Sequence, residues 1–194
     1  MAAPGETPAA PQPSPQLQSL VRSPGYLGNI QRLFAALPTD VFQRCPDLVA
    51  PASAASVLTP VTFAPDGYPV SGTWRQSFPV RGCGNDTTIN IFFQAQPDEK
   101  IASIVAVPGD TRANLTLQRD ALRYAWLGAK AVAPDCTTPH ARHTRYDGVV
   151  DTARKAWRET WIIAACGRNV AVPITFTPDA TGTTISAQMP RPIG

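Results

Sequence analysis

Charged residues are scarce in this sequence. Asp, Glu, Lys and Arg make up 16% of the chain, whereas they form roughly 25% of an average domain. The 17 Lys and Arg residues are scattered, and with 14 Asp and Glu residues they give a net charge of only +3. Proteins that bind nucleic acid carry clustered basic residues. We therefore expect no nucleic acid among the partners of this protein.

Long apolar runs are also missing. No stretch approaches the roughly 20 apolar residues that a membrane-spanning helix needs. Residues 1–16 lack the charged start and apolar run of a signal peptide. Their Pro- and Ala-rich composition predicts an extended, unfolded tether instead. We interpret the chain as the mature form of an exported protein, with a lipid-anchored protein held near a membrane by this tether as the alternative.

Motifs of catalysis are few. The sequence has no Gly-x-Ser-x-Gly, no Gly-rich phosphate loop and no Cys-x-x-Cys. Its two histidines, His140 and His143, lie with Cys136 and Asp147 in an expected loop and could form a zinc site. A disulfide would remove the Cys136 thiolate, however, and neighbouring arginines would repel a cation. We expect no catalytic residue, metal or cofactor, and keep a metal-dependent or hydrolytic enzyme using His140 and His143 as the alternative.

What the sequence does contain is an internal repeat. Residues 74–84, Trp-Arg-Gln-Ser-Phe-Pro-Val-Arg-Gly-Cys-Gly, return 83 residues later at 157–167 as Trp-Arg-Glu-Thr-Trp-Ile-Ile-Ala-Ala-Cys-Gly. The correspondence continues without a gap, and Phe93 matches Phe176. A repeat of this length predicts two copies of one structural unit.

Each copy shows the pattern of a helix followed by strands. Apolar residues recur at helical spacing over 26–37, and a second helix is predicted from the cap residues Asp110-Thr111 to about Val132. Alternating apolar residues then predict three strands in each copy. These strands cover 74–80, 87–94 and 101–107 in the first copy and 157–163, 170–177 and 183–189 in the second. A further short strand is possible at 57–63, and Asp66-Gly67 and Asp147-Gly148 are typical of turns.

The fold class that follows is α+β, with two tandem pseudo-symmetric α-β-β-β repeats, an antiparallel sheet and the helices on one face. We predict a disordered tether over residues 1–19, a first repeat over 20–108 and a second over 109–194, packed as one body. Two such units can join edge to edge into one continuous sheet. In outline this layout resembles the tandem αβ repeats of β-lactamase inhibitor proteins, although no motif or residue is carried over from that family.

The four cysteines fall as one pair in each copy. Their spacing suits neither a metal site nor a redox motif. The repeat favours the disulfides Cys45–Cys83 and Cys136–Cys166, which would require an oxidising compartment. Together with the Ala- and Pro-rich composition, typical of a bacterial source, this predicts a periplasmic or secreted protein.

Four residues are candidate ligand contacts. Arg75 and Arg158 occupy equivalent strand positions and point away from the aromatic face, so they can offer two cationic points to a partner. Trp161 and Tyr146 lie in the second copy, where the sequence has diverged most. Aromatic residues that alternate along a strand are also typical of a core, and a core role for the tryptophans is the alternative.

The leading function is binding without catalysis. We expect an exported protein that holds a protein partner or a small apolar ligand on its open sheet face or between the repeats. A structural module of the cell envelope is the second alternative to this interpretation.

Overall fold

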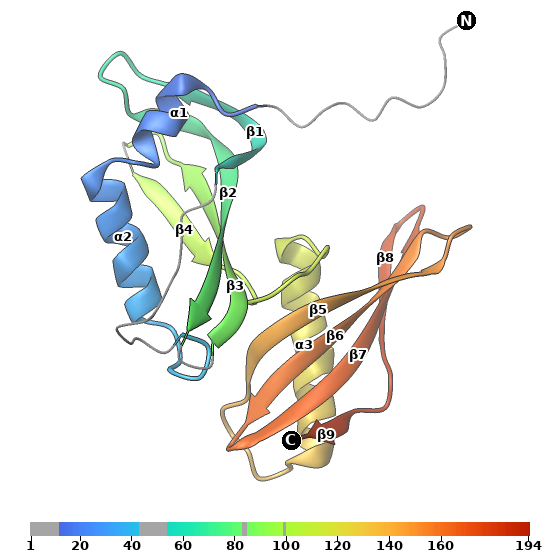
Figure 1. Ribbon diagram of the computed structural model, residues 1–194. Helices are drawn as coiled ribbons and strands as arrows, with labels where there is room; N and C mark the ends of the chain where they lie inside the picture. The colour runs from blue at the N-terminus through green and yellow to red at the C-terminus, as the bar shows by residue number, and fades with distance from the viewer. Residues whose placement is uncertain (1–11, 43–53, 83–84, 99) are drawn as a thin grey trace, which may run out of the picture. The chain divides into compact units, whose positions relative to one another are not determined.

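The computed structural model describes residues 12–42, 54–82, 85–98 and 100–194 (Figure 1). These residues form an α+β protein with two antiparallel sheets. The helices are α1 (Pro15–Leu20), α2 (Pro24–Ala35) and α3 (Leu115–Val132). The first sheet contains β1 (Ser56–Phe63), β2 (Pro69–Gly82), β3 (Asn85–Ala95) and β4 (Ile101–Val105). The second contains β5 (His140–Asp151), β6 (Ala156–Ala165), β7 (Arg168–Asp179), β8 (Gly182–Ala187) and β9 (Arg191–Ile193).

The described chain divides into two compact units. Unit 1 contains α1, α2, β1 and β4, together with residues 69–79 of β2 and 90–95 of β3. Unit 2 contains α3 and the strands β5 to β9, together with residues 38–42 and the remaining ends of β2 and β3. The boundary predicted between residues 108 and 109 instead assigns residues 38–42 and the ends of β2 and β3 to the first repeat.

In unit 1, α2 packs on a meander whose strands follow in the order β1-β2-β3-β4. The helix begins after Ser23, whose hydroxyl oxygen accepts a hydrogen bond from the Tyr26 backbone N–H at 3.4 Å. Pro24 suits the first helical position, because an N–H there would have no partner within the helix. On the inner face of α2, Phe34 packs edge-on against Phe78 with 5.3 Å between ring centroids. The predicted first helix is confirmed.

Two stacked aromatic pairs occupy equivalent positions of the sequence repeat. The rings of Trp74 and Phe93 lie 5.5 Å apart with 13° between their planes. Those of Trp157 and Phe176, each 83 residues later, lie 4.9 Å apart with 10° between their planes. Such a pair contributes about 0.5–1.5 kcal/mol beyond the area it buries. Trp74 is fully buried, whereas Trp157 is only partly buried.

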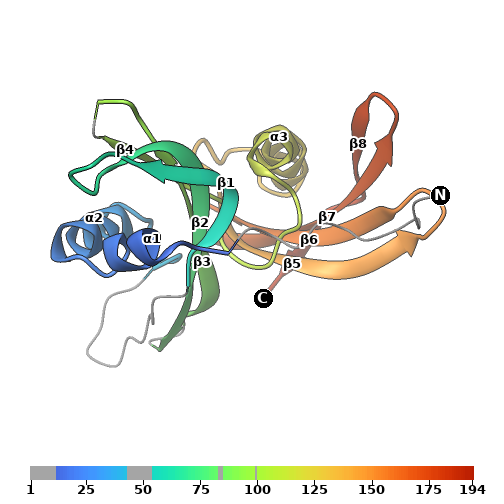
Figure 2. The ribbon, with the colours of Figure 1, turned by 90° about the horizontal axis from the view of Figure 1, so that it is seen from above.

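In unit 2, α3 covers one face of a sheet ordered β5-β6-β7-β8, and β9 pairs with another part of β7. Figure 2 shows the helix end-on above this sheet. The small side chains of Ala121, Ala125 and Ala129 form its buried face, which lets the helix approach the sheet closely. They pack in one core with the β6 residues Trp161 and Ile163. Among the described residues α3 is the helix of unit 2, so the other face of this sheet has no helix from its own unit.

The predicted second helix is present, but its predicted start at Asp110-Thr111 is wrong. The helix begins at Leu115, and the Asn114 side chain caps it by accepting a hydrogen bond from the Leu117 backbone N–H at 3.0 Å. Thr111 lies ahead of the helix, where its hydroxyl donates to Glu159 Oε2 of β6 at 2.7 Å and accepts from the Ala113 backbone N–H at 3.1 Å.

Two further predictions are corrected. The strands form two sheets instead of one continuous sheet, because each meander pairs its strands in chain order and α3 follows β4 directly. The expected loop at 140–146 is the start of β5, which pairs with β6 from His140–Ala164 to Asp151–Ala156. Its His and Arg residues carry little strand signal of their own, and Asp147-Gly148 is typical of a turn, so pairing with the apolar strand β6 decides its conformation. The possible strand at 57–63 is confirmed as β1.

The predicted tether of residues 1–19 is described only from residue 12 onward. Its last part forms α1, where Ser14 caps the helix and Pro15 follows as its first residue. Leu17 is fully buried and Val21 nearly so. These apolar residues dock the segment on the fold, which the Pro-rich composition of the preceding residues does not reveal.

Candidate ligand-binding surface

A β-bulge places the central carboxylate of the candidate site. Tyr146 pairs with Glu159 and Gly148 pairs with Arg158, so Asp147 is an extra residue between two consecutive pairs. Gly148 has φ of +119°, a backbone conformation that glycine adopts readily. The expected turn at Asp147-Gly148 is therefore wrong, although Asp66-Gly67 does form a turn between β1 and β2. The bulge turns the Asp147 side chain toward the open face of the sheet.

Around Asp147 lies a shallow hollow of about 600 Å³, which we call the Arg basin. It is lined by Arg145, Asp147, Arg158, Thr160, Pro173, Gln188, Met189 and Arg191. The β6 residues Arg158 and Thr160 alternate with Trp161 and Ile163, which pack toward α3. The Arg basin therefore lies on the sheet face opposite α3.

Asp147 holds two of the basin's guanidinium groups and a hydroxyl. Arg145 Nε donates to Asp147 Oδ1 at 2.9 Å, and Thr160 Oγ1 donates to Oδ2 at 2.6 Å. Arg158 Nε lies 3.7 Å from the same Oδ2. The side chain of Asp147 is only 13% exposed, whereas those of Arg145 and Arg158 are 64% and 41% exposed. The carboxylate side chain is thus mostly covered by these partners, whereas the guanidinium groups remain open to solvent.

The electrostatics of the basin follow from this arrangement. Burial raises the pKa of Asp147, but the hydrogen bonds from Thr160 and Arg145 and the charges of Arg145 and Arg158 outweigh it, so the pKa lies below its usual value. Asp147 is therefore ionised at neutral pH. With Arg191, the basin has three cations around one carboxylate, and an anion is the ligand that this excess of positive charge favours.

Trp161 has a different place from the one predicted. It is fully buried, and its indole N–H donates to Glu159 Oε2 at 3.0 Å. It therefore belongs to the core of unit 2 and contacts no open surface.

Glu159 itself is a fully buried carboxylate with four donors around it. Oε1 accepts from the Arg112 backbone N–H at 2.8 Å and from Trp157 Nε1 at 2.9 Å. Oε2 accepts from Thr111 Oγ1 at 2.7 Å and from Trp161 Nε1 at 3.0 Å. A carboxylate is an acceptor only, so it suits a site where every neighbour donates.

Gln76 of unit 1 occupies the position in the repeat that Glu159 occupies in unit 2. Its hydrogen bonds explain why a neutral side chain stands there. The Tyr26 hydroxyl donates to Gln76 Oε1 at 2.6 Å and accepts from Trp74 Nε1 at 3.0 Å. The hydroxyl thus stands between the indole and the amide, and a neutral side chain completes the chain of hydrogen bonds. Burial raises the pKa of Tyr26, with a smaller opposing effect of the Trp74 hydrogen bond, so the phenol remains protonated.

Tyr146 and Arg75 also lie outside the Arg basin. Tyr146 is half-buried and pairs with Glu159 across the strands, and the Arg112 guanidinium lies 4.1 Å above its ring centroid. Arg75 belongs to unit 1, where it pairs with Ser56 of β1. Its Nε is buried without a hydrogen-bond partner among the described residues. Of the four predicted ligand contacts, the structure therefore places Arg158 in the basin.

The two histidines lie on β5 and have separate partners. His140 Nε2 lies 2.8 Å from Asp40 Oδ1, and His143 Nδ1 lies 3.0 Å from Thr87 Oγ1. Burial lowers the pKa of His143 in spite of nearby carboxylates. Within the described ranges, no three His, Cys, Asp or Glu residues gather as metal ligands.

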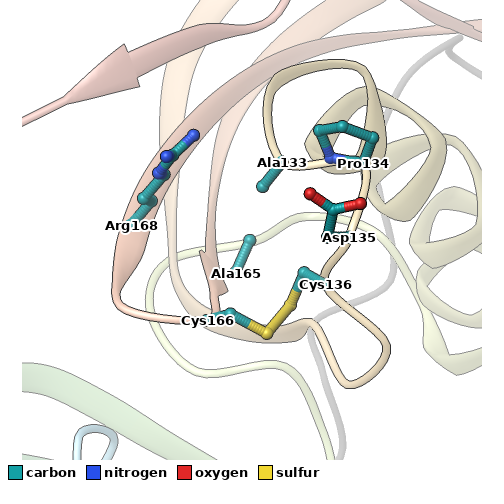
Figure 3. A pocket seen from close by; sticks show the side chains of 7 residues that line it. All are labelled: Ala133, Pro134, Asp135, Cys136, Ala165, Cys166 and Arg168. Carbon is teal, nitrogen blue, oxygen red and sulfur yellow. A yellow bond between two sulfur atoms is a disulfide. The ribbon is translucent and has the colours of Figure 1, made fainter.

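Cys136 and Cys166 form the predicted disulfide, with 5.5 Å between their Cα atoms. The Cys136 thiolate required for the zinc alternative is therefore oxidised. The other predicted disulfide, Cys45–Cys83, lies outside the described residues. Beside the observed disulfide is a hollow of about 190 Å³, with Arg168 and Asp135 on opposite sides (Figure 3). It is smaller than the roughly 300–1,000 Å³ of typical ligand sites.

Comparison with known proteins adds no relative. No protein-family model matches the chain, and no curated protein or solved structure matches it either.

The residues that sequence reasoning missed in the Arg basin are chiefly Arg145, Asp147 and Arg191. A period-two pattern over 143–147 would have placed Arg145 and Asp147 on one face, had this stretch been recognised as a strand.

Proposed function

We propose that this protein is an exported, periplasmic binding protein without catalytic activity, and that the Arg basin binds carboxylate groups of an acidic protein partner. The observation that carries this proposal is the set of three arginines that line the Arg basin, two of which pair with the mostly covered carboxylate of Asp147. An exposed guanidinium binds a carboxylate through two parallel hydrogen bonds.

Asp147 supports this role by orienting its neighbours. It contacts both Arg145 and Arg158 through Nε. No other hydrogen bond or ion pair joins these two guanidinium groups to the described part of the chain. Their terminal nitrogens are therefore available to a ligand, held at defined positions on two adjacent strands. Holding them in place reduces the entropy that binding would otherwise cost.

An acidic partner fits the basin better than the small apolar ligand that we also considered. Met189, with 88% of its surface exposed, and Pro173 are the apolar residues of the lining, and the others are polar or charged. Met189 adds an adaptable apolar contact beside the cations. A flat protein surface with carboxylates and some apolar area matches this mixture.

Export is part of the same proposal. The Cys136–Cys166 disulfide is compatible with an oxidising, extracellular or periplasmic compartment. No helix in the described part of the chain is long and apolar enough to cross a membrane.

Calorimetry with a hexaglutamate peptide tests the basin. We expect binding that weakens as salt rises from 50 to 300 mM, and roughly tenfold weaker binding for Arg158→Ala, because a hydrogen-bonded charged pair is lost. Arg154→Ala is the matched control, since Arg154 is exposed in the turn between β5 and β6 and pairs with Asp151 at 2.7 Å outside the basin. Equal loss in both variants, or no binding by the wild type, would refute the proposal.

A further inference from the structure

Helix α3 has a second face that the fold does not use. Opposite its buried alanines it exposes three cations and three large apolar side chains. This α3 outer face consists of Arg119, Arg123, Tyr124, Trp126, Leu127 and Lys130. Arg119, Arg123, Trp126, Leu127 and Lys130 recur at intervals of three or four residues, so they form one stripe along the helix.

The apolar residues of this face are unusually exposed. Leu127 is 68% exposed, Tyr124 42% and Trp126 41%. The other tryptophans are less exposed, since Trp74 and Trp161 are fully buried and Trp157 is partly buried. Large apolar side chains that share one exposed patch commonly mark an interaction surface.

The charge of the face is positive. Arg119, Arg123 and Lys130 are opposed by one carboxylate, Asp120, which lies 3.5 Å from Arg119. These four are all the charged residues of α3. Two of the three cations, Arg123 and Lys130, have no ion-pair partner among the described residues and flank Trp126 and Leu127 along the helix.

We propose that the α3 outer face binds the surface of an anionic lipid bilayer. Trp and Tyr favour the headgroup region because each has an apolar body and a polar tip. Lys and Arg beside them are attracted to acidic headgroups, and a leucine that projects between them enters the acyl boundary. The side chains of this face combine these three contacts.

The geometry of unit 2 is consistent with this orientation. Helix α3 and the Arg basin lie on opposite faces of the second sheet, so a membrane bound by α3 leaves the basin accessible to a soluble partner. The inference does not rest on the function proposed for the basin. Either surface can operate without the other.

Tryptophan fluorescence with lipid vesicles provides the test, because Trp126 is the exposed reporter. We expect a blue shift and reduced acrylamide quenching with vesicles of 30% phosphatidylglycerol in phosphatidylcholine, but little change with phosphatidylcholine alone. Co-sedimentation should show binding at 50 mM salt that is largely lost at 500 mM. Trp126→Phe should remove most of the shift while the protein still sediments with vesicles.

Charge-reversal variants distinguish binding through the α3 outer face from attraction by the net positive charge of the protein. Arg123→Glu with Lys130→Glu should weaken vesicle binding at least 30-fold, because each cation near an anionic surface contributes about fivefold. Arg22→Glu with Arg32→Glu changes the net charge equally at exposed positions of unit 1 and should have a much smaller effect. Leu127→Ser tests the apolar contact and should weaken binding at constant charge. Circular dichroism and thermal unfolding establish that each variant is folded.

Three results would overturn the inference. One is the absence of co-sedimentation at 1 mM anionic lipid, and another is equal weakening by the two double variants. The third is concentration-dependent self-association that Leu127→Ser abolishes, which would assign the face to a second copy of the chain. Hexaglutamate binding by the same variants is measured separately, so failure of this inference and failure of the basin proposal can be distinguished.

Discussion

Replacing Glu159 by Gln tests whether the buried carboxylate organises unit 2. Both side chains have nearly the same shape, so packing changes little. The difference lies in hydrogen bonding, because a carboxylate accepts through both oxygens and an amide has one oxygen and one NH₂ group. All four partners of Glu159 now donate to it.

The magnitude follows from the orientation that the amide can adopt. If the NH₂ group takes the place of Oε2, the Thr111 hydroxyl can rotate and accept from it, but Trp161 Nε1 cannot. One buried indole N–H is then left without a partner, which costs about 1–3 kcal/mol. The two remaining bonds change from charge-assisted to neutral and lose about 0.5–1 kcal/mol each. Relief of carboxylate desolvation opposes these losses, and we expect a net destabilisation of about 2–4 kcal/mol.

Thermal and urea unfolding followed by circular dichroism measure this change. At about 2–4 °C per kcal/mol for a chain of this size, the Tm should fall by roughly 4–16 °C. The double variant with Trp161→Phe provides a cycle, because it removes the indole N–H that the Gln would leave unpaired. Its destabilisation should be smaller than the sum of the two single changes by about 1 kcal/mol or more.

Two outcomes would refute this reasoning. A Tm for Glu159→Gln within 2 °C of wild type would show that the four hydrogen bonds add nothing beyond what a neutral amide provides. Strict additivity with Trp161→Phe would show that no donor is orphaned.

Other predictions concern the rest of the fold. Leu17→Ala should cost about 2–5 kcal/mol in urea unfolding because the side chain is fully buried, and an unchanged midpoint would mean that α1 is not part of the fold. Reducing Cys136–Cys166 should lower stability by about 3–4 kcal/mol, the loop-entropy value for its separation of 30 residues; a Tm unaffected by reductant would contradict this. Burial lowers the pKa of His143, so below the usual value of 6.5 the unfolded chain binds more protons than the folded one. Stability should therefore fall as the pH drops from 7.5 to 5.5, and His143→Gln should make that fall smaller in thermal unfolding; an identical fall would exclude His143 as its source.

Most strands could be predicted from the sequence because their cores are built locally. Trp161 and Ile163 belong to an apolar stretch that is typical of a buried strand, and the amphipathic pattern of α3 is complete within one helix. The disulfide Cys136–Cys166 followed from the repeat in the same way. Local periodicity specifies an element wherever the element buries one face.

The candidate site could not be predicted in the same way. Arg158 was recognised because it is repeated, but Arg145 and Asp147 lie in a stretch whose His, Arg, Asp and Gly residues are typical of a loop. Asp147-Gly148 is typical of a turn when read alone, and only the register with Arg158 makes it a bulge. A bulge depends on the partner strand, so no local pattern specifies it.

The sequence by itself determined the α+β class, the principal helices, most strands of both meanders and one disulfide, because these depend on residue spacing along the chain. Tertiary structure decided that the strands form two sheets and that residues 140–151 form β5. It also decided that Trp161 is buried, with its indole N–H bonded to Glu159. Finally, it decided that Arg145 and Arg158 pair with Asp147 and that Arg191 lines the same hollow. The physical reason is that such groupings join residues from different strands, and their distances depend on register and packing instead of sequence separation.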